Sequence, residues 1–237
     1  MVDPYGAIVR GDTTEKSIFL VFTGDEFADG GAVIRSVLRQ RNVKAGFFFT
    51  GNFYANDEFE PLIKDLLQDG HYLGAHSDKH LLYCDWSKRD SLLVTRRQFR
   101  RDLKRNYKRM AEFGIDKNEA KVFLPPYEWY NASVVKWTHE LGLTLVNFTP
   151  GTLSTADYTY PDMGTRYRNS DTIFRSIMDY ESNARIGMNG FILLVHIGTD
   201  PRRTDKFYDR LDQLLVTLME KGYSFKRIDE LVPEGTE

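Results

Sequence analysis

The chain has 237 residues, of which 41% are hydrophobic and 28% charged, a balance typical of a folded globular protein. Its 32 lysines and arginines against 34 acidic residues give a net charge of −2, so no global positive charge marks a nucleic-acid-binding protein. The single cysteine, Cys84, excludes an internal disulfide and a multi-cysteine metal centre, which leaves histidine, aspartate and glutamate as metal ligands. We expect no membrane span, because no apolar run approaches roughly 18 residues, and no signal peptide in this chain.

Short apolar runs alternate with longer segments of helical periodicity. The runs predict strands over residues 18–22, 45–50, 72–76, 121–124, 143–148, 191–197 and 223–228. The segments between them predict helices over residues 31–41, 57–68, 87–113, 131–141, 171–186 and 205–221. Because the apolar runs are continuous rather than alternating, we expect strands buried on both faces, as in a parallel sheet covered by helices.

These repeats follow one another without a linker rich in proline, glycine or serine, which predicts one α/β domain over residues 1–237. A barrel or near-barrel of about seven parallel strands is the simplest arrangement, and an open doubly wound sheet is the alternative. Residues 149–170 are polar and rich in tyrosine and resist assignment; a loop of that length is usually functional.

Reactive side chains follow several of the predicted strands, at the edge where such folds place their working groups. Asp25 and Glu26 follow the first run, His76 and His80 the third, and His196 lies near the end of the sixth. The spacing of the first two histidines places both imidazoles on one face of a helical turn, close enough to grip one cation. Asp25 or Glu26 would complete a site of two histidines and one carboxylate. The alternative makes His76 a helix cap and His80 a surface residue.

Residues 70–80, GHYLGAHSDKH, resemble the G-H-E-I-G-N-H-[ST]-x-x-H stretch of the polysaccharide deacetylases, carbohydrate esterase family 4. In the same order, residues 45–51 are similar to the family's A-T-F-F-x-x-G, residues 124–127 to R-P-P-Y-G, residues 193–196 to L-x-H, and residues 222–231 to G-Y-x-F-x-x-[LI]-x-E-L. The combination covers nearly the whole chain and is far more specific than any one motif.

The resemblance implies a distorted (β/α) barrel that removes N-acetyl or O-acetyl groups from a carbohydrate. It implies one divalent metal ion, with zinc expected first and cobalt or nickel as alternatives, held by Asp25, His76 and His80. It further implies that His196 is the acid that protonates the leaving group. An extracytoplasmic location, periplasmic or secreted, is expected from the resemblance alone.

The chain differs from the family at the position of the catalytic base. The family's first strand ends T-F-D-D-G, whose first aspartate is the base and whose second is a metal ligand, whereas here Phe22 is followed by Thr23, Gly24, Asp25 and Glu26. Either Asp25 and Glu26 are the shifted equivalent of this pair, or the two positions have become Thr23 and Gly24 with only one acid replaced nearby.

Other motif positions also differ. Leu124 replaces the arginine that orients the family's base, and residues 149–152 replace its D-x-x-D-W motif, so the base machinery is rebuilt or lost. Glu128 stands where the family has glycine after Pro-Pro-Tyr; it is a relocated base or a substrate ligand, or it caps the helix that starts near Asn131.

Substrate contacts are expected from the same segment. The backbone beside Pro126 and Tyr127 would help to stabilise the oxyanion, and Trp129 is one of several aromatic residues placed to stack on a sugar. The basic residues between 96 and 109 are interpreted as a solvated helix face rather than a nucleic-acid site.

The leading hypothesis is therefore a metal-dependent carbohydrate deacetylase with Glu26 or Glu128 as base. Two alternatives remain: a carbohydrate-binding relative that keeps the cleft and metal but has lost turnover, and a hydrolase of another amide or ester.

Overall fold

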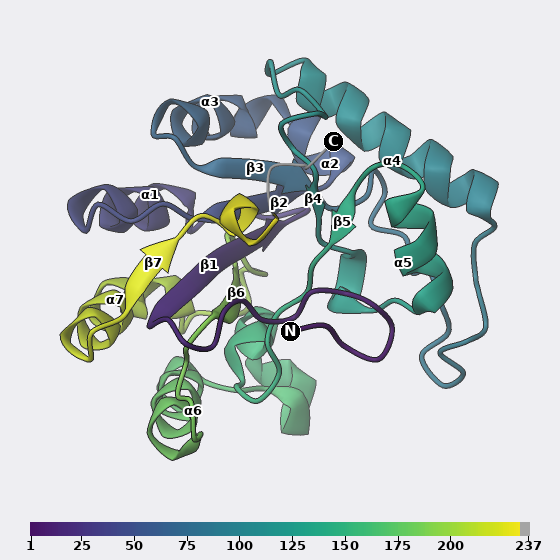
Figure 1. Ribbon diagram of the computed structural model, residues 1–237. Coiled ribbons are helices and arrows are strands. Elements are labelled where there is room, and N and C mark those ends of the chain that lie inside the picture. The colour runs from purple at the N-terminus through teal and green to yellow at the C-terminus, as the bar shows by residue number, and fades with distance from the viewer. Residues whose placement is uncertain (233–237) are drawn as a thin grey trace.

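The computed structural model describes residues 1–232, and residues 233–237 of the predicted domain lie outside the described residues (Figure 1). Seven parallel strands form one sheet in the order β5-β4-β3-β2-β1-β6, with β7 paired to β1. The strands are β1 (Ser17–Gly24), β2 (Gly46–Phe49), β3 (Tyr72–Ala75), β4 (Val122–Phe123), β5 (Thr144–Leu145), β6 (Phe191–His196) and β7 (Ser224–Lys226).

Helices surround this sheet, which curls between them (Figure 1). They are α1 (Gly31–Gln40), α2 (Gly51–Tyr54), α3 (Glu60–Gln68), α4 (Arg96–Ala111), α5 (Ala132–His139), α6 (Ser170–Asn183) and α7 (Leu211–Glu220). Short 3₁₀ turns η1 to η6 cover Asp57–Phe59, Pro126–Glu128, Ser154–Tyr158, Pro161–Arg166, Phe207–Arg210 and Ile228–Leu231. The distorted (β/α) barrel is confirmed, and the seven strands lie at the seven predicted runs. No helix within residues 1–232 is long and apolar enough to cross a membrane.

Strand β1 lies at the centre of the sheet, and all eight of its residues are buried. One edge of β1 pairs with β6. The other edge is shared: residues 17–19 pair with β7 and residues 21–24 pair with β2. In a regular closed barrel each edge of a strand pairs with one neighbour, so the pairing of one edge of β1 with both β7 and β2 is one source of the distortion.

The first ten residues fill the gap between the two ends of the sheet. Ile8 forms a parallel bridge to Val146, just after β5, and Arg10 forms an antiparallel bridge to Phe191 at the start of β6. The buried guanidinium of Arg10 donates hydrogen bonds to two backbone carbonyls and to a tyrosine hydroxyl, all within residues 180–189. The amino-terminal segment thus links β5 to β6, a role that the sequence did not suggest.

The aromatic core reaches the carboxyl end of β1. Phe49 stacks on Phe53 with ring centroids 3.9 Å apart. A Cβ atom at Gly24 would lie 2.9 Å from Phe53 and 2.8 Å from Ile197, so this position has no room for a side chain without movement of the core.

The predicted helix over residues 87–113 is wrong in its first part, because the helix begins only at Arg96. The carboxylate of Asp85 accepts hydrogen bonds from the backbone N–H groups of Ser87 and Lys88, which stabilises a turn in place of a helix. Thr95 and Gln98 then form a capping box that fixes the true start.

Candidate active site

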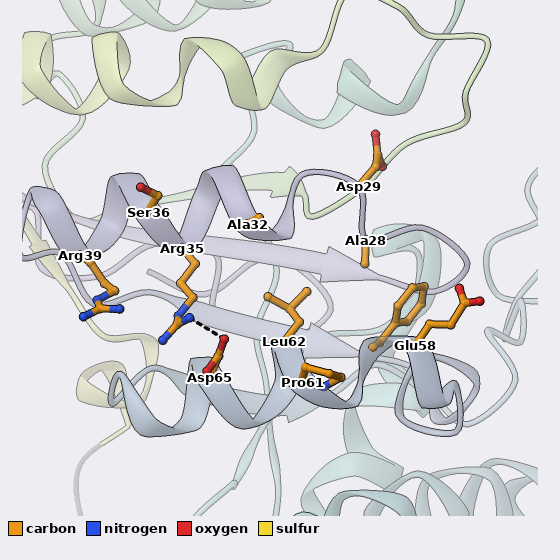
Figure 2. Close-up of a pocket in the computed structure, with 11 residues that line it drawn as sticks. Ala28, Asp29, Ala32, Arg35, Ser36, Arg39, Glu58, Pro61, Leu62 and Asp65 are labelled. Carbon is orange, nitrogen blue, oxygen red and sulfur yellow. Dashed lines mark hydrogen bonds and ion pairs between the residues drawn. The ribbon is translucent and has the colours of Figure 1, made fainter.

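A cavity of about 920 Å³ opens beyond the carboxyl ends of the strands. Its wall is formed by residues that follow β1, β3, β4 and β6 and by residues of the 149–170 segment. The cavity therefore places these residues together, while their chemical roles stay predictions. Of the predicted site residues, the cavity brings together Asp25, Glu26, His76, His80, Tyr127, Glu128 and His196. A second cavity, of about 670 Å³, lies between α1 and α3 beside the Arg35–Asp65 ion pair and holds none of the predicted site residues (Figure 2).

His76 is fixed in orientation directly after β3. Its ring Nδ1–H donates to the carbonyl of Leu124 over 2.8 Å, which leaves Nε2 as the nitrogen that can bind a ligand. Burial lowers the pKa of His76 well below its ordinary value, and the neighbouring His80 lowers it further. Both effects hold the imidazole neutral, the form that a metal ligand requires.

The expected helical turn between His76 and His80 is wrong. Residues 76–80 form an irregular loop in which Ser77 and His80 adopt left-handed backbone angles, with φ of 74° and 50°. The loop is held by the buried carboxylate of Asp102 in α4, which accepts hydrogen bonds from two successive backbone N–H groups of residues 78–79. The two rings still approach, with centroids 5.1 Å apart.

Asp25 lies next to this pair. One carboxylate oxygen is 3.9 Å from Nδ1 of His80, and the other accepts a hydrogen bond of 2.6 Å from the hydroxyl of Thr50. Glu26, by contrast, is exposed at the rim of the cavity.

The donor set suits a divalent metal ion in chemistry, because Asp25, His76 and His80 supply two imidazoles and one carboxylate. Within residues 1–232, however, no group of three such side chains has the geometry to hold an ion as it stands. Ligand atoms about 2.0–2.1 Å from one tetrahedral zinc ion lie roughly 3.4 Å apart. One carboxylate oxygen of Asp25 and Nδ1 of His80 are 3.9 Å apart, close to this separation.

The end of β1 explains why Asp25 takes this position. Thr23 and Gly24 occupy the two places that directly follow Phe22, and Thr23 is in register with His196 on β6. Since Gly24 has no room for a side chain, the first carboxylate of the segment is Asp25, one residue beyond the strand.

His196 is paired with Asp157, a residue that the sequence analysis missed. Nδ1 of His196 lies 2.6 Å from one carboxylate oxygen of Asp157, and the backbone N–H of His196 donates to the other oxygen over 2.8 Å. Burial lowers the pKa of His196, but the charge and hydrogen bond of Asp157 outweigh it and raise the pKa above its ordinary value. The signals for Asp157 were its place in the unassigned segment 149–170 and the Tyr158 that follows it, a pair similar to the closing D-W of the family's D-x-x-D-W motif.

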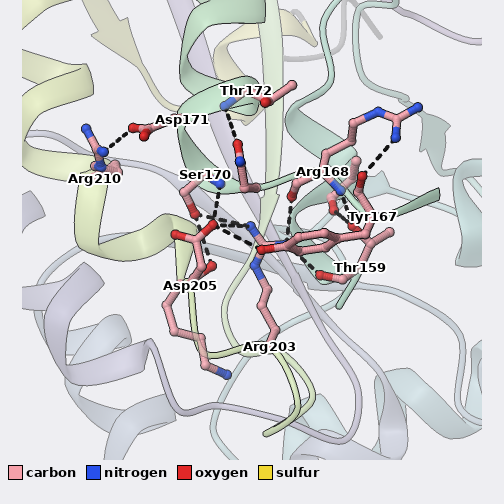
Figure 3. A network of polar contacts seen from close by, with 12 residues as sticks. Thr159, Tyr167, Arg168, Ser170, Asp171, Thr172, Arg203, Asp205 and Arg210 are labelled. Carbon is pink, nitrogen blue, oxygen red and sulfur yellow. Dashed lines mark hydrogen bonds and ion pairs between the residues drawn. The ribbon is translucent and has the colours of Figure 1, made fainter. Parts of the chain in front are cut away.

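A buried arginine anchors this segment. Arg203 donates hydrogen bonds to the carbonyl oxygens of Thr159 and Arg168, over 2.5 and 2.9 Å, and to the hydroxyl of Ser170 over 3.1 Å (Figure 3). These contacts tie the chain after β6 to the residues that follow Asp157. The cavity wall on this side is therefore held by side-chain hydrogen bonds rather than by regular secondary structure.

Glu128 faces the same cavity. Burial raises its pKa to about 7, although the nearby His196 acts in the opposite direction. Tyr127 and Glu128 both adopt left-handed angles, φ 59° and 51°, a strained pair of the kind that clusters at functional sites. The capping alternative for Glu128 is wrong, because the side chain of Asn131 caps α5.

Aromatic side chains form one lip of the cavity. Trp86 is 55% exposed and packs with ring centroids 5.4 Å from Trp129 and 5.7 Å from Tyr127. Trp86 and Tyr127 line the cavity, whereas Trp129 lies behind them and the buried Pro126 is not part of the wall. Trp129 thus supports Trp86 instead of facing the cavity itself.

The polysaccharide deacetylase family model matches residues 10–146, more than half of the chain. The chain therefore belongs to the polysaccharide deacetylase family.

Individual relatives agree with this membership. PdaA, the peptidoglycan-N-acetylmuramic acid deacetylase of Bacillus subtilis, is 25% identical over 99% of this chain and 78% of PdaA. The solved structure of PdaA matches with a TM-score of 0.73 at 24% identity, over 96% of this chain and 85% of that one. PgdA of Listeria monocytogenes, a peptidoglycan-N-acetylglucosamine deacetylase, is 26% identical over 93% of this chain and 40% of PgdA.

A further structural relative is described as a pseudoenzyme. BA3943 of Bacillus anthracis, from the same carbohydrate esterase family, matches with a TM-score of 0.73 at 19% identity, over 98% of this chain and 70% of that one. The fold is thus shared by named deacetylases and by a protein named as a pseudoenzyme, so it does not by itself decide activity.

Proposed function

We propose that this chain is a divalent-metal-dependent hydrolase that removes acetyl groups from a carbohydrate polymer outside the cytoplasm. The observation that carries the proposal is the Asp157–His196 pair, because it opens onto the same cavity as His76, His80 and Glu128. A histidine whose pKa is raised above the ordinary value, beside two histidines whose pKa values are lowered, has the properties of a general acid beside metal ligands.

In this proposal Asp25, His76 and His80 hold the ion, with zinc expected first and cobalt or nickel also compatible with the donors. When bound, the ion polarises the acyl carbonyl and lowers the pKa of a bound water.

Proton transfer falls to two side chains of the chain itself. Glu128, with a pKa of about 7, is ionised in a large fraction of molecules at neutral pH and takes the proton of the attacking water. His196 gives a proton to the leaving amine or alcohol as the carbonyl carbon–nitrogen or carbon–oxygen bond breaks. Glu26 is the less favoured base, because its side chain lies exposed at the rim of the cavity.

The substrate proposed is an N-acetylated amino-sugar polymer. The names of PdaA and PgdA support this class, and the exposed rings of Trp86 and Tyr127 offer the flat apolar surface on which sugar rings stack. The near-neutral net charge of the chain imposes no barrier to such a glycan.

One set of observations favours a second candidate, a glycan-binding relative without turnover. Neither Thr23 nor Gly24, the last two residues of β1, carries an acid, no closed metal site exists within residues 1–232, and BA3943 is named a pseudoenzyme. This candidate keeps the cavity and its aromatic lip but assigns no proton transfer to Glu128.

Release of acetate separates the two candidates. The metal-loaded protein is incubated with peptidoglycan fragments, chitin oligomers and acetylated xylan, while binding of the same oligomers is measured by calorimetry. Acetate release supports the hydrolase, whereas binding of the oligomers without any acetate refutes it in favour of the second candidate. Glu26→Gln and Glu128→Gln serve as a matched pair: only the second is expected to abolish the rate while bound metal is retained.

Metal content tests the ligand assignment separately. His76→Ala and His80→Ala are each expected to lower the bound metal per chain, with His139→Ala, a helix residue outside the cavity, as the control. Undiminished stoichiometry in both variants would show that the ion, if bound, sits elsewhere.

A further inference from the structure

The outer face of α4 carries an unusual concentration of positive charge. Its exposed basic residues form two parallel rows along the helix: Arg96, Arg100, Lys104 and Lys108 in one, and Arg97, Arg101, Arg105 and Arg109 in the other. Within each row successive charges are four residues apart, which corresponds to about 6 Å along the axis. The two rows together form a band of charge about 20 Å long.

Within residues 1–232, few acidic side chains pair with this band. Arg96 pairs with Glu140 and Arg109 pairs with Glu112, at the two ends of the helix. For the six basic residues between them, no ion pair is formed within residues 1–232. The one acid of α4, Asp102, is buried and is already used by the loop after His76.

The band also works against the helix that carries it. Each row contains three like-charged pairs at i, i+4 spacing, and such pairs destabilise a helix. Arg96 and Arg97 place positive charge in the first turn, where the helix dipole favours the opposite sign. A helix face that only contacts water usually carries charges of both signs. A face with charges of one sign along four turns therefore indicates a negatively charged partner.

The side chains on this face indicate the chemical class of the partner. Six of the eight side chains are arginines, whose planar guanidinium groups bind phosphate in a bidentate manner. The face has no exposed aromatic residue on which a base could stack. Its apolar residues, Phe99, Leu103 and Met110, are buried against the core, so none is available to enter a bilayer.

We propose that α4 binds a linear phosphodiester polymer that lacks bases, held through its phosphates along the two rows. Figure 1 shows α4 on the outside of the molecule, where an extended chain has access to its whole length. The surface is distinct from the cavity, since none of the eight basic residues lines it. The proposal therefore goes beyond the deacetylase activity and stands whether or not that activity is found.

The test measures binding of purified poly(glycerol phosphate) to the intact protein as a function of salt. If the six unpaired cations contact phosphates, the logarithm of the association constant should fall with the logarithm of salt concentration with a slope of about −4. Affinity then drops a few hundred-fold between 50 and 200 mM salt. Arg100→Gln/Arg101→Gln should reduce the slope to about −3, because two contacts are removed.

The control is Arg175→Gln/Arg185→Gln, which removes the same charge from exposed positions on and just after α6 and should leave the slope unchanged. Circular dichroism of both double variants checks the fold, and the α4 variant should melt no lower than the parent because it relieves like-charged pairs.

Two further probes decide the partner class. Single-stranded DNA of equal phosphate number and vesicles containing phosphatidylglycerol are measured in the same way. The proposal is overturned if poly(glycerol phosphate) does not bind, if both double variants weaken binding equally, or if DNA or the vesicles bind more tightly than the polymer. Tightest binding of the polymer, weakened only by the α4 variant, supports it.

Discussion

Replacement of Asp157 by asparagine tests the assignment of His196 most directly. The carboxylate contacts His196 twice, at the ring Nδ1 and at the backbone N–H. Asparagine has the same shape but only one acceptor oxygen, so one of the two contacts must face an amide NH₂ group. If the backbone contact is kept, the NH₂ group meets Nδ1 and favours the tautomer that carries its proton on Nε2.

The magnitude follows from the geometry. Nδ1 of His196 and a carboxylate oxygen of Asp157 are 2.6 Å apart, and a hydrogen bond to a charged group contributes about 1.5–3 kcal/mol, an attraction that the variant loses. Once this attraction is lost, burial dominates and lowers the pKa of His196 below its ordinary value. We expect the pKa of His196 to be lower in Asp157→Asn than in the parent.

Two measurements follow this change. NMR titration of the imidazole reports the pKa of His196, and urea denaturation at several pH values reports the free energy of unfolding. Because the folded-state pKa of His196 is raised above the unfolded value, its stabilising contribution is full below about pH 6.5 and disappears as pH rises through the folded-state pKa. The variant should therefore be less stable than the parent at pH 5, and the difference should shrink toward pH 9.

The hydrolase assignment adds an activity readout, a fall in kcat of about 10²- to 10⁴-fold. Asp162→Asn is the matched control, since Asp162 lies in the same segment but is exposed. An unchanged pKa of His196 in Asp157→Asn, or an equal shift in Asp162→Asn, would refute the reasoning.

Three further predictions rest on separate features. Gly24→Ala should lower the free energy of unfolding, measured in urea, by about 1–3 kcal/mol, because its Cβ would meet Ile197 and Phe53 within 3 Å. Gly142→Ala is the control for steric crowding, because the added atom meets nothing within 4 Å and only the φ of 72° adds strain. Arg203→Met should lower the free energy of unfolding by about 2–4 kcal/mol in the same assay, because the acceptors on Thr159, Arg168 and Ser170 lose their donor. The exposed Arg202→Met should have a much smaller effect, and equal losses would contradict the anchoring role. Glu128→Gln should have a free energy of unfolding up to about 3 kcal/mol higher than the parent at pH 8 and equal to it at pH 4. The reason is that a carboxyl whose folded-state pKa is raised to about 7 lowers the stability of the folded protein as pH rises from 4.5. A difference that does not change with pH would contradict this raised pKa.

The sequence predicted the parts of the fold that depend on local patterns. All seven strands lie at the predicted runs; β1, β2 and β6 are continuous apolar runs because they are buried on both faces, whereas the short β7 has two polar residues of three and is partly exposed. Features that depend on distant contacts were not predicted. The bridges of residues 8–10 between β5 and β6 join segments far apart in the chain, and no periodicity in ten residues reports them.

The candidate site shows the same division. His76, His80 and His196 were found because they follow or end apolar runs, but the helical turn expected from the four-residue spacing does not form. The carboxylate of Asp102, 24 residues after Asp78, holds that loop instead. Asp157 was missed for a related reason, since its segment takes its shape from Arg203 and not from its own sequence.

The central position of β1 has a consequence for the order of folding. As the chain is synthesised, β1 is made early, yet its partner on one edge is β6, which begins only at Phe191. Arg10 likewise binds Asn189, 179 residues later. Until β6 is made, the fully buried strand β1 keeps one edge unpaired, and contacts of such long sequence separation form slowly. A nascent or truncated chain that ends before β6 therefore exposes an aggregation-prone edge, which makes synthesis of β6 the step that commits this barrel to its native state.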